Sequence, residues 1–443
     1  MQNRKKIIRA VLAVLLAMPA AAWAQGSSLN TFSPYTFYGL GDFSIQGPTF
    51  LRSMGGAGVG FRDYRKVNYL NPASFSVLAR KSFLFNVDLQ GNNSYLKTAN
   101  AKTSHNSFNV RDIALAMPLG TSIGLGISVT PLSSVGYRVD MNETDPYILA
   151  SGMDIVYSYI GEGNVTQAKM GLGLQVFKRL ALGVDLVYYH GSLNRSYTTT
   201  IRALLDDSKY IGVAGLTTEE ISRMNVNFGM QLDLISGSKR ALTLGATYTP
   251  RVNLRPSTTD QIFPNNFEPD TIRYVSGKKD FALPGTLTVG LFYQTMKFGA
   301  GFDYSLQRWN GVNAPDPLNG VDFRSNHYFK LGAQYTPDPM SVRHFLARWT
   351  YRAGIRYNDY YMQFGGKKIN DLAFTVGIGI PITKNMWISS INLGAEFGRR
   401  GNTQSVTLPN HKQFQMIREN YVRFSIGLSL FGTDDWFKRF KYQ

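Results

Sequence analysis

Arginines recur at every fourth position of one stretch of the chain, at Arg348, Arg352 and Arg356. Side chains that are four residues apart lie on the same face of a β-strand, so these guanidinium groups would point the same way. Arginine binds a carboxylate through two parallel hydrogen bonds. This face is therefore a candidate site for the head group of an anionic ligand, and Lys330 and Arg423 are expected on equivalent faces of other strands.

Two further candidates for contact with such a head group, Arg65 and Lys66, lie near the N-terminus beside Arg62. The alternative is that these cations are neutralised by carboxylates of the protein, because buried charges are usually paired. Acidic residues on matching faces could provide this pairing, and they are Asp185, Asp233, Asp303 and Glu396. The sequence leaves both interpretations open.

Residues that could support catalysis are few. His105 and His190 have serines nearby, but no recognisable nucleophile motif surrounds them. The chain has no Cys and 5 His, which argues against a thiolate or His-rich metal site. We therefore expect no catalytic residue, no metal and no cofactor, and a barrel hydrolase is the weakest of the functions considered.

A glycine-rich segment precedes the regular part of the chain. Gly55, Gly56, Gly58 and Gly60 fall within six residues. Glycines at this density permit positive φ angles and close approach of other groups. We expect Gly55, Gly56 and Gly58 to allow tight backbone packing, with ligand contact as the alternative. The segment is predicted to plug the barrel that the rest of the chain forms.

The glycine run is followed by Asn71, Pro72 and Ala73. Asn-Pro favours a turn and biases the residue before proline away from helix. These three residues are predicted either to form an element that shifts when ligand binds or to be a fixed turn before the first strand.

From Lys81 onward, apolar and polar residues alternate with a period of two, as in Gln167 to Val176. Only 17% of residues are charged and 13% are aromatic. A soluble β-sandwich would also alternate, but large apolar faces opposite faces of Gly, Ser, Thr and Asn favour a membrane barrel. We predict fourteen strands, centred near Phe85, Ile113, Leu125, Leu172, Val184, Phe228, Leu244, Val289, Phe302, Leu331, Tyr351, Val376, Leu393 and Ile426.

The predicted connections alternate between short turns and long polar loops, such as Leu132 to Asn164 and Gly191 to Glu220. This alternation and the even number of strands are typical of an outer-membrane barrel, with the short turns in the periplasm. Residues 1–24 have a basic start, an apolar core and an Ala-Trp-Ala site, which predicts a secretory signal peptide. We expect a plug in residues 25–80 and a barrel with a short C-terminal tail in residues 81–443.

The formal net charge of +18 suits nucleic acid or anionic lipid head groups. Export and the scatter of the charges along the chain favour outer-membrane lipid, and no nucleic-acid partner is expected.

With these motifs in place, the chain resembles the FadL/TodX family of outer-membrane transporters. The matching residues are Met54 to Val59 and Asn71 to Ser74, directly before the first strand. Ser33-Pro34-Tyr35 and Gly39-Leu40-Gly41 resemble the versions found in Bacteroidetes. The resemblance implies an all-β fold, a 14-stranded antiparallel transmembrane β-barrel with an N-terminal hatch inside its lumen.

The resemblance also implies passive uptake of hydrophobic small molecules, such as long-chain fatty acids or aromatic hydrocarbons, by a monomeric barrel in the outer membrane of a Gram-negative cell. The ligand would be held in the lumen, released by hatch movement, and leave laterally at a kinked third strand. Gly124, Gly126 and Pro131 are the residues that could mark this kink. Relatives with this fold serve in protein secretion, so the alternative is a scaffold that docks a secreted or cell-surface protein.

Overall fold

The computed structural model describes residues 31–99, 101–143, 145–203, 209–210, 212–237, 239–264, 272–312, 321–382, 389–407 and 413–433. The expected signal peptide and most of the C-terminal tail lie outside these residues. No helix in these ranges is long and apolar enough to cross a membrane.

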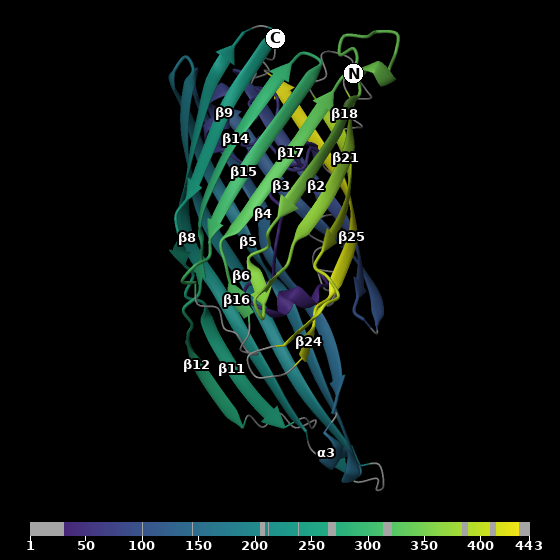
Figure 1. Cartoon of the computed structure of the whole chain (residues 1–443). Helices are drawn as coiled ribbons and strands as arrows, with labels where there is room; N and C mark the ends of the chain where they lie inside the picture. Colours follow the sequence, from purple (N-terminus) through teal and green to yellow (C-terminus); the bar gives the residue numbers. More distant parts are fainter. Residues whose placement is uncertain are drawn as a thin grey trace, which may run out of the picture.

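The chain folds into a closed antiparallel barrel of fourteen strands (Figure 1). Closure comes from β2 and β25, which pair in register from Ser82 and Thr433 to Lys97 and Arg418. This confirms the predicted fold class, and each predicted strand centre lies within one of the strands. The barrel strands are β2 (Ser82–Lys97), β3 (Lys102–Pro118), β4 (Ile123–Asn142), β5 (Met153–Phe177), β6 (Leu180–Ala203), β8 (Val213–Ser236), β9 (Arg240–Thr249), β14 (Gly285–Thr295), β15 (Phe298–Arg308), β17 (Asn326–Tyr335), β18 (Thr350–Asn358), β21 (Asp371–Pro381), β22 (Ser390–Arg400) and β25 (Arg418–Thr433).

The two faces of the wall have opposite character because successive side chains of a strand point to opposite sides. Large apolar side chains such as Leu172, Phe302 and Phe424 are exposed on the outer face. Polar side chains such as Asp303 and Asn392 are buried on the inner face. An apolar outer band around a polar interior is the pattern that a bilayer requires of a barrel.

Strands on one side of the barrel continue far past the others at the end where the long connections lie (Figure 1). The prediction of long loops at Leu132 to Asn164 and at Gly191 to Glu220 is wrong, because strands β4, β5, β6 and β8 occupy most of these residues. The hairpin of β11 (Ser257–Pro264) and β12 (Arg273–Lys278) extends this sheet by pairing with β8. Short elements at the same end are β7 (Lys209–Tyr210) and α3 (Pro146–Ala150).

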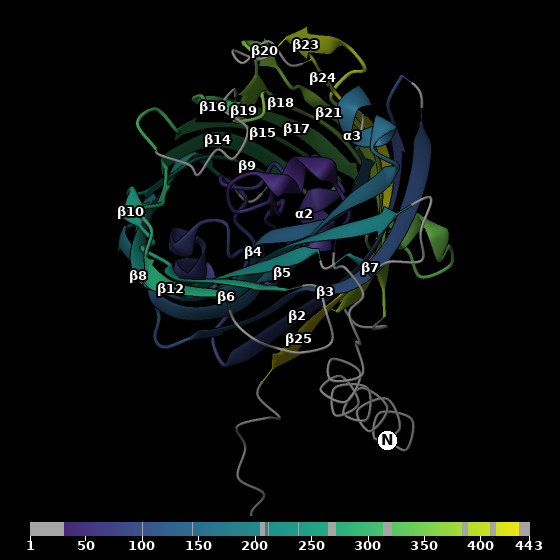
Figure 2. The same ribbon diagram turned by 90° about the horizontal axis from the view of Figure 1, so that it is seen from below.

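The hatch segment, residues 31–80, lies inside the ring of strands (Figure 2). It consists of short pieces joined by turns, and two of these turns have positive φ at Gly55 and Gly56. Its buried side chains include Phe50, Leu51 and Met54. The elements are η1 (Pro34–Phe37), β1 (Asp42–Phe43), α2 (Thr49–Arg52) and η2 (Pro72–Val77).

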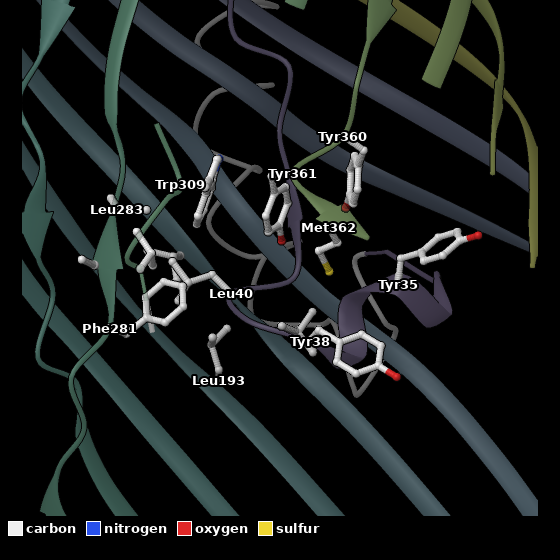
Figure 3. Close-up of a cluster of buried hydrophobic side chains, with 14 of the residues drawn as sticks. Tyr35, Tyr38, Leu40, Leu193, Phe281, Leu283, Trp309, Tyr360, Tyr361 and Met362 are labelled. Atoms are coloured by element: carbon white, nitrogen blue, oxygen red, sulfur yellow. The ribbon is translucent and has the colours of Figure 1, made fainter. Parts of the chain in front are cut away.

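A hydrophobic cluster fills the barrel on the long-loop side of the hatch segment (Figure 3). Trp309 and Tyr361 stack at its centre, with ring centroids 4.3 Å apart, and Tyr35, Tyr38 and Leu40 of the hatch segment join them. Short strands lie in the connections of the barrel: β10 (Val252–Asn253), β13 (Ala282–Leu283), β16 (Val321–Phe323), β19 (Met362–Phe364), β20 (Lys367–Lys368), β23 (Ser405–Thr407) and β24 (Gln413–Gln415). The connection between β17 and β18 contains η3 (Leu346–Arg348).

Candidate functional site

The barrel wall is interrupted between β3 and β4. The ladder between these strands ends at Ile113 and Val129. On either side the neighbouring ladders continue, that of β2 and β3 to residues 97 and 102 and that of β4 and β5 to residues 142 and 156. Within the described chain, residues 102–112 of β3 therefore have a barrel partner on one side only.

The hatch segment partly occupies the place of the missing partner. Its strand β1 pairs antiparallel with β4, with Asp42 opposite Ser134 and Phe43 opposite Ser133. The register of β4 shifts at this point, between Pro131 and Ser133. Proline has no N–H for a ladder hydrogen bond, which gives a physical reason for the irregularity. The hatch segment is thus joined to the wall beside the interruption.

Arg111 connects the opposite edge of the interruption to the hatch segment. The register between β2 and β3 shifts so that Arg111 has no opposite residue, which is a β-bulge. Its guanidinium donates to the Ser44 hydroxyl at 3.0 Å and to the Ile45 carbonyl at 2.8 Å. Arg111 was not among the residues predicted from the sequence. The sequence does indicate a bulge here, because the apolar residues of this strand lie at even positions at Phe108 and Val110 and at an odd position from Ile113 onward.

A pocket of about 440 Å³, which we call the side pocket, lies behind the unpaired part of β3. Phe43 and Ile45 of the hatch segment form one wall. Phe108 and Val110 of β3 lie at the outer edge, where their side chains are exposed next to the apolar outer band. The pocket has the size of a small-molecule site and combines apolar walls with a few polar groups.

Polar groups enter the side pocket from several strands, and Arg423 is one of the two arginines in its lining. Arg423 donates to Glu396 at 2.9 Å and lies over the ring of Tyr421. It can therefore contact a ligand only as part of an existing ion pair. Among the sequence-predicted head-group contacts, this is the one that the fold brings to the side pocket.

Gly124 and Gly126 have a different role from the kink proposed for them. A β-carbon at Gly124 would collide with the carbonyl of Phe75, and one at Gly126 would collide with the Phe75 ring. Both positions lie where β4 pairs regularly with β3 and β5. These glycines make room for the hatch segment, and the break in β4 occurs further along, at Pro131.

The Asn-Pro-Ala motif lies against the barrel wall. Asn71 has an extended backbone and caps η2, accepting a hydrogen bond from the Ala73 N–H at 3.1 Å. Its amide donates to the carbonyls of Val59 at 3.0 Å and of Met230 in β8 at 2.9 Å. Pro72 and Ala73 are also buried. The motif is positioned to fix the hatch segment to β8, and no part of it lines the side pocket.

The glycine run is likewise bound to the wall. The Gly55 N–H donates to the Thr375 hydroxyl at 2.9 Å, and the Gly58 N–H donates to Asp303 at 2.7 Å. A β-carbon at Gly55 would lie 2.7 Å from the Ile355 carbonyl oxygen, and Gly56 has the same positive φ. Gly55, Gly56 and Gly58 lie outside the side pocket too.

The remaining candidate cations differ in their partners. Arg356 donates to Glu396 at 2.5 Å, and Arg65 binds Asp63 at 3.1 Å. Lys330 is opposite Asp303 in the ladder, and its Nζ lies 4.7 Å from the centre of the Tyr328 ring.

Arg352 and Lys66 have no carboxylate within 4.0 Å in the part of the chain that the structure describes. The fold brings these two cations together with Arg65 at a second cavity, near the short turns.

The two histidines considered as catalytic candidates stack on aromatic rings. His105 stacks on Phe32, and His190 stacks on Tyr188. Across the described ranges, no group of three or more His, Asp or Glu side chains is arranged to hold a metal ion.

Solved structures with a similar fold include three outer-membrane proteins. A FadL homologue from Pseudomonas aeruginosa has a TM-score of 0.58 and 11% identity, over 88% of this chain and 99% of that chain. The toluene transporter TodX of P. putida has a TM-score of 0.52 and 15% identity, over 88% and 99%. The toluene transporter TbuX of Ralstonia pickettii has values of 0.51 and 14%, over 87% and 98%. At these identities the likeness establishes the fold alone.

The sequence also matches a family model. The model, described as BamG, covers residues 5–443, which is nearly the whole chain. No curated protein sequence is significantly similar to the chain.

Proposed function

We propose that this chain, which belongs to the BamG family, is an outer-membrane channel for hydrophobic small molecules. The interrupted wall carries the proposal, because it opens the side pocket toward the apolar outer band at Phe108 and Val110. An opening at this place would let an apolar ligand pass between the pocket and the membrane without crossing water. The solved structures named as toluene transporters have the same fold, which supports a ligand of this class.

The ligand class that fits the side pocket is an apolar molecule with one polar or acidic end, such as a long-chain fatty acid, or a small aromatic hydrocarbon. Phe43, Ile45 and Leu89 would contact the apolar part. Arg111 and Arg423 are the cations near which a carboxylate would lie. Transport would be passive, with the concentration gradient setting its direction. The proposed cell location is the outer membrane of a Gram-negative bacterium of the Bacteroidetes type.

Movement of the hatch segment would control access to the lumen. Strand β1 is held to β4 by a short ladder at Asp42 and Phe43, which a small displacement could release. The side pocket is bounded by the same segment, so its shape depends on where β1 lies.

A disulfide lock tests the movement of β1, and the chain offers a background without Cys. Phe43→Cys with Ser133→Cys places two thiols at directly opposite antiparallel positions, where Cα atoms are about 4.5–5.5 Å apart and a disulfide can form. We expect oxidation to slow the binding of a fluorescent fatty acid by the purified protein in detergent, and reductant to restore it.

The matched control is Thr218→Cys with Thr259→Cys, an opposite pair between β8 and β11 outside the site. Its oxidation should leave binding unchanged. Equal binding rates for the oxidised and reduced Phe43/Ser133 variant would exclude movement of β1. Absence of binding to any member of a fatty-acid and aromatic panel would exclude the channel itself.

A second candidate function is a scaffold that docks a secreted or cell-surface protein. The extended side of the barrel favours it, because its tip exposes Tyr147 to 88%, Ile272 to 64% and Tyr274 to 61%. Exposed apolar side chains at a rim are typical of protein-interaction sites. A stoichiometric partner recovered by cross-linking in cells, and lost with Tyr147→Ser and Tyr274→Ser, would favour the scaffold over the channel.

A further inference from the structure

A cavity of about 550 Å³, which we call the basic cavity, lies between the hatch segment and the short-turn end of the barrel. Eight lysine or arginine side chains and one carboxylate, that of Asp63, line it within the described ranges. The cations come from the hatch segment, from the turns before β9 and β15, and from β18 and the connection before it. Residues far apart in the sequence are thus gathered into one strongly positive site, which is separate from the side pocket.

Arg352 lies in the wall of the basic cavity, on the inner face of β18, and only 5% of it is exposed. Its hydrogen-bond partners are neutral amide oxygens, Gln334 Oε1 at 3.4 Å and Asn392 Oδ1 at 3.1 Å. No carboxylate lies within 4.0 Å of it among the described residues. A buried charge is costly unless it is paired, so this guanidinium lacks the counter-ion that Arg356 has in Glu396.

Lys66 is the second cation that has no carboxylate within 4.0 Å among the described residues. Its ammonium lies over the Phe50 ring, 4.9 Å from the ring centre. The neighbouring carboxylate of Asp63 is already bound by the Arg65 guanidinium, at 3.1 Å and 3.3 Å. Burial, together with the positive charge of Arg352, lowers the pKa of Lys66 to about 7. Two cations that repel one another thus share a cavity in which Asp63, the one lining carboxylate among the described residues, is already engaged.

We propose that the basic cavity binds an anion that carries a phosphate group, with Arg352 and Lys66 as its inner contacts. Arginine matches phosphate by two parallel hydrogen bonds, and lysine adds a point charge. A phosphate monoester carries more charge than a single carboxylate, which suits the large excess of cations. Arg240 and Arg348 also line the cavity, and Arg240 is exposed. The source of the phosphate is either a soluble compound or a lipid head group. This proposal does not depend on ligand exchange at the side pocket.

Binding of defined probes by the purified full-length protein tests this proposal. The soluble probe is inorganic pyrophosphate, and the lipid probe is short-chain phosphatidic acid, whose head group is a phosphate monoester, with sodium octanoate as the carboxylate comparison. We expect at least one phosphate probe to bind more tightly than octanoate. Lys66→Met combined with Arg352→Gln should weaken that binding by about tenfold or more, as loss of two charge-assisted contacts predicts. Tight pyrophosphate binding would indicate a soluble source, and binding of phosphatidic acid alone would indicate lipid.

The matched control is Arg273→Gln with Lys278→Met, which removes the same two charge types from the exposed strand β12. It should bind the probes as the unchanged protein does. If the double variant at Lys66 and Arg352 fails to fold, Arg240→Gln with Arg348→Gln in the same cavity tests the proposal instead, with weaker binding expected. The proposal is overturned if no phosphate probe binds, if octanoate binds equally well, or if the control weakens binding as much as the site variants.

Discussion

The cations of the lumen differ in whether a carboxylate of the protein pairs with them. Arg356 and Arg423 share Glu396, and Arg62 binds Asp233 at 2.6 Å. These pairs satisfy the electrostatic requirement of a buried charge within the protein. The prediction that lumen acids pair with the cations is therefore correct for some of them. Lys66 and Arg352 differ, because no carboxylate among the described residues lies within 4.0 Å of either. Proteins commonly keep unpaired charges of this kind at binding sites, although the charges reduce the stability of the fold.

Lys66→Met should stabilise the protein, and more so at low pH. The pKa of Lys66 is lowered from 10.5 to about 7, first by burial and then by Arg352, against the opposing effect of Asp63. The unfolded chain keeps this proton up to a higher pH, so the native state is penalised increasingly as pH falls from 10.5 to 7 and fully below that. Replacing the ammonium with an apolar side chain removes the penalty.

The measurement is the temperature at which the folded barrel loses its altered mobility on a gel, taken near pH 6 and near pH 9. We expect the gain from Lys66→Met to be larger near pH 6. Lys278→Met on the exposed strand β12 serves as the control and should change neither value. A larger gain near pH 9 would contradict the assigned direction of the pKa shift.

At the scale of the elements, η2 packs against three strands of the barrel wall. Glycines on the inner faces of β5, β6 and β8 form a surface without side chains, and η2 lies directly on it. A β-carbon at Gly183 would collide with the Ala73 nitrogen, and one at Gly229 with the Asn71 side chain. The small inner residues of these strands therefore fix the position of the hatch segment as well as leaving space in the lumen.

Gly183→Val should displace η2 and loosen the hatch segment. Forcing a side chain into a packed interface typically costs about 1–3 kcal/mol, here against hatch backbone that cannot rotate away. We expect faster cleavage by trypsin after Arg62, Arg65 or Lys66, measured by mass spectrometry on the purified protein.

Gly277→Val is the comparison for this variant, because a β-carbon there meets nothing within 4 Å. Unchanged protection of the hatch segment in Gly183→Val would show that η2 does not depend on the glycine surface.

At the scale of the whole molecule, the barrel is closed on the long-loop side and interrupted in its wall. The stacked pair of Trp309 and Tyr361 lies in a cluster built from loops distant in the sequence and from η1. The side pocket lies instead beside β3, next to the apolar outer band. This arrangement favours passage through the wall over passage along the axis of the barrel.

Trp309→Ala with Tyr361→Ala should open the long-loop end. Loss of a buried Trp typically costs about 3–5 kcal/mol and leaves a cavity, which would weaken the cluster that blocks the lumen. We expect the variant to show a higher single-channel conductance in planar bilayers than the unchanged protein. Tyr147→Ala, at an exposed tip, should have no effect. Equal conductance in the unchanged and doubly substituted proteins would place the block elsewhere.

The regular part of the fold was predictable because alternation in the membrane zone is imposed by the bilayer. The strands near Leu172 and Phe302 show this, with apolar residues facing lipid at every second position. Large apolar residues are sparse in residues 191–203 of β6, where polar residues separate Leu193, Tyr197 and Ile201, so this stretch was predicted as a loop. The bulge at Arg111 shifts the alternation of apolar and polar residues by only one position. A shift this small is easily missed when the pattern of a single strand is considered.

The fourteen strands could be predicted from the sequence, because the period of two and the short turns are local properties of the chain. It also indicated a compact, glycine-rich segment ahead of the barrel. The pairing of the cations, the place where the wall is interrupted, and the cavity shared by Lys66 and Arg352 became apparent from the folded structure alone. These features depend on contacts between residues hundreds of positions apart, such as Arg352 and Lys66, and the spacing of residues along one chain carries no information about such contacts.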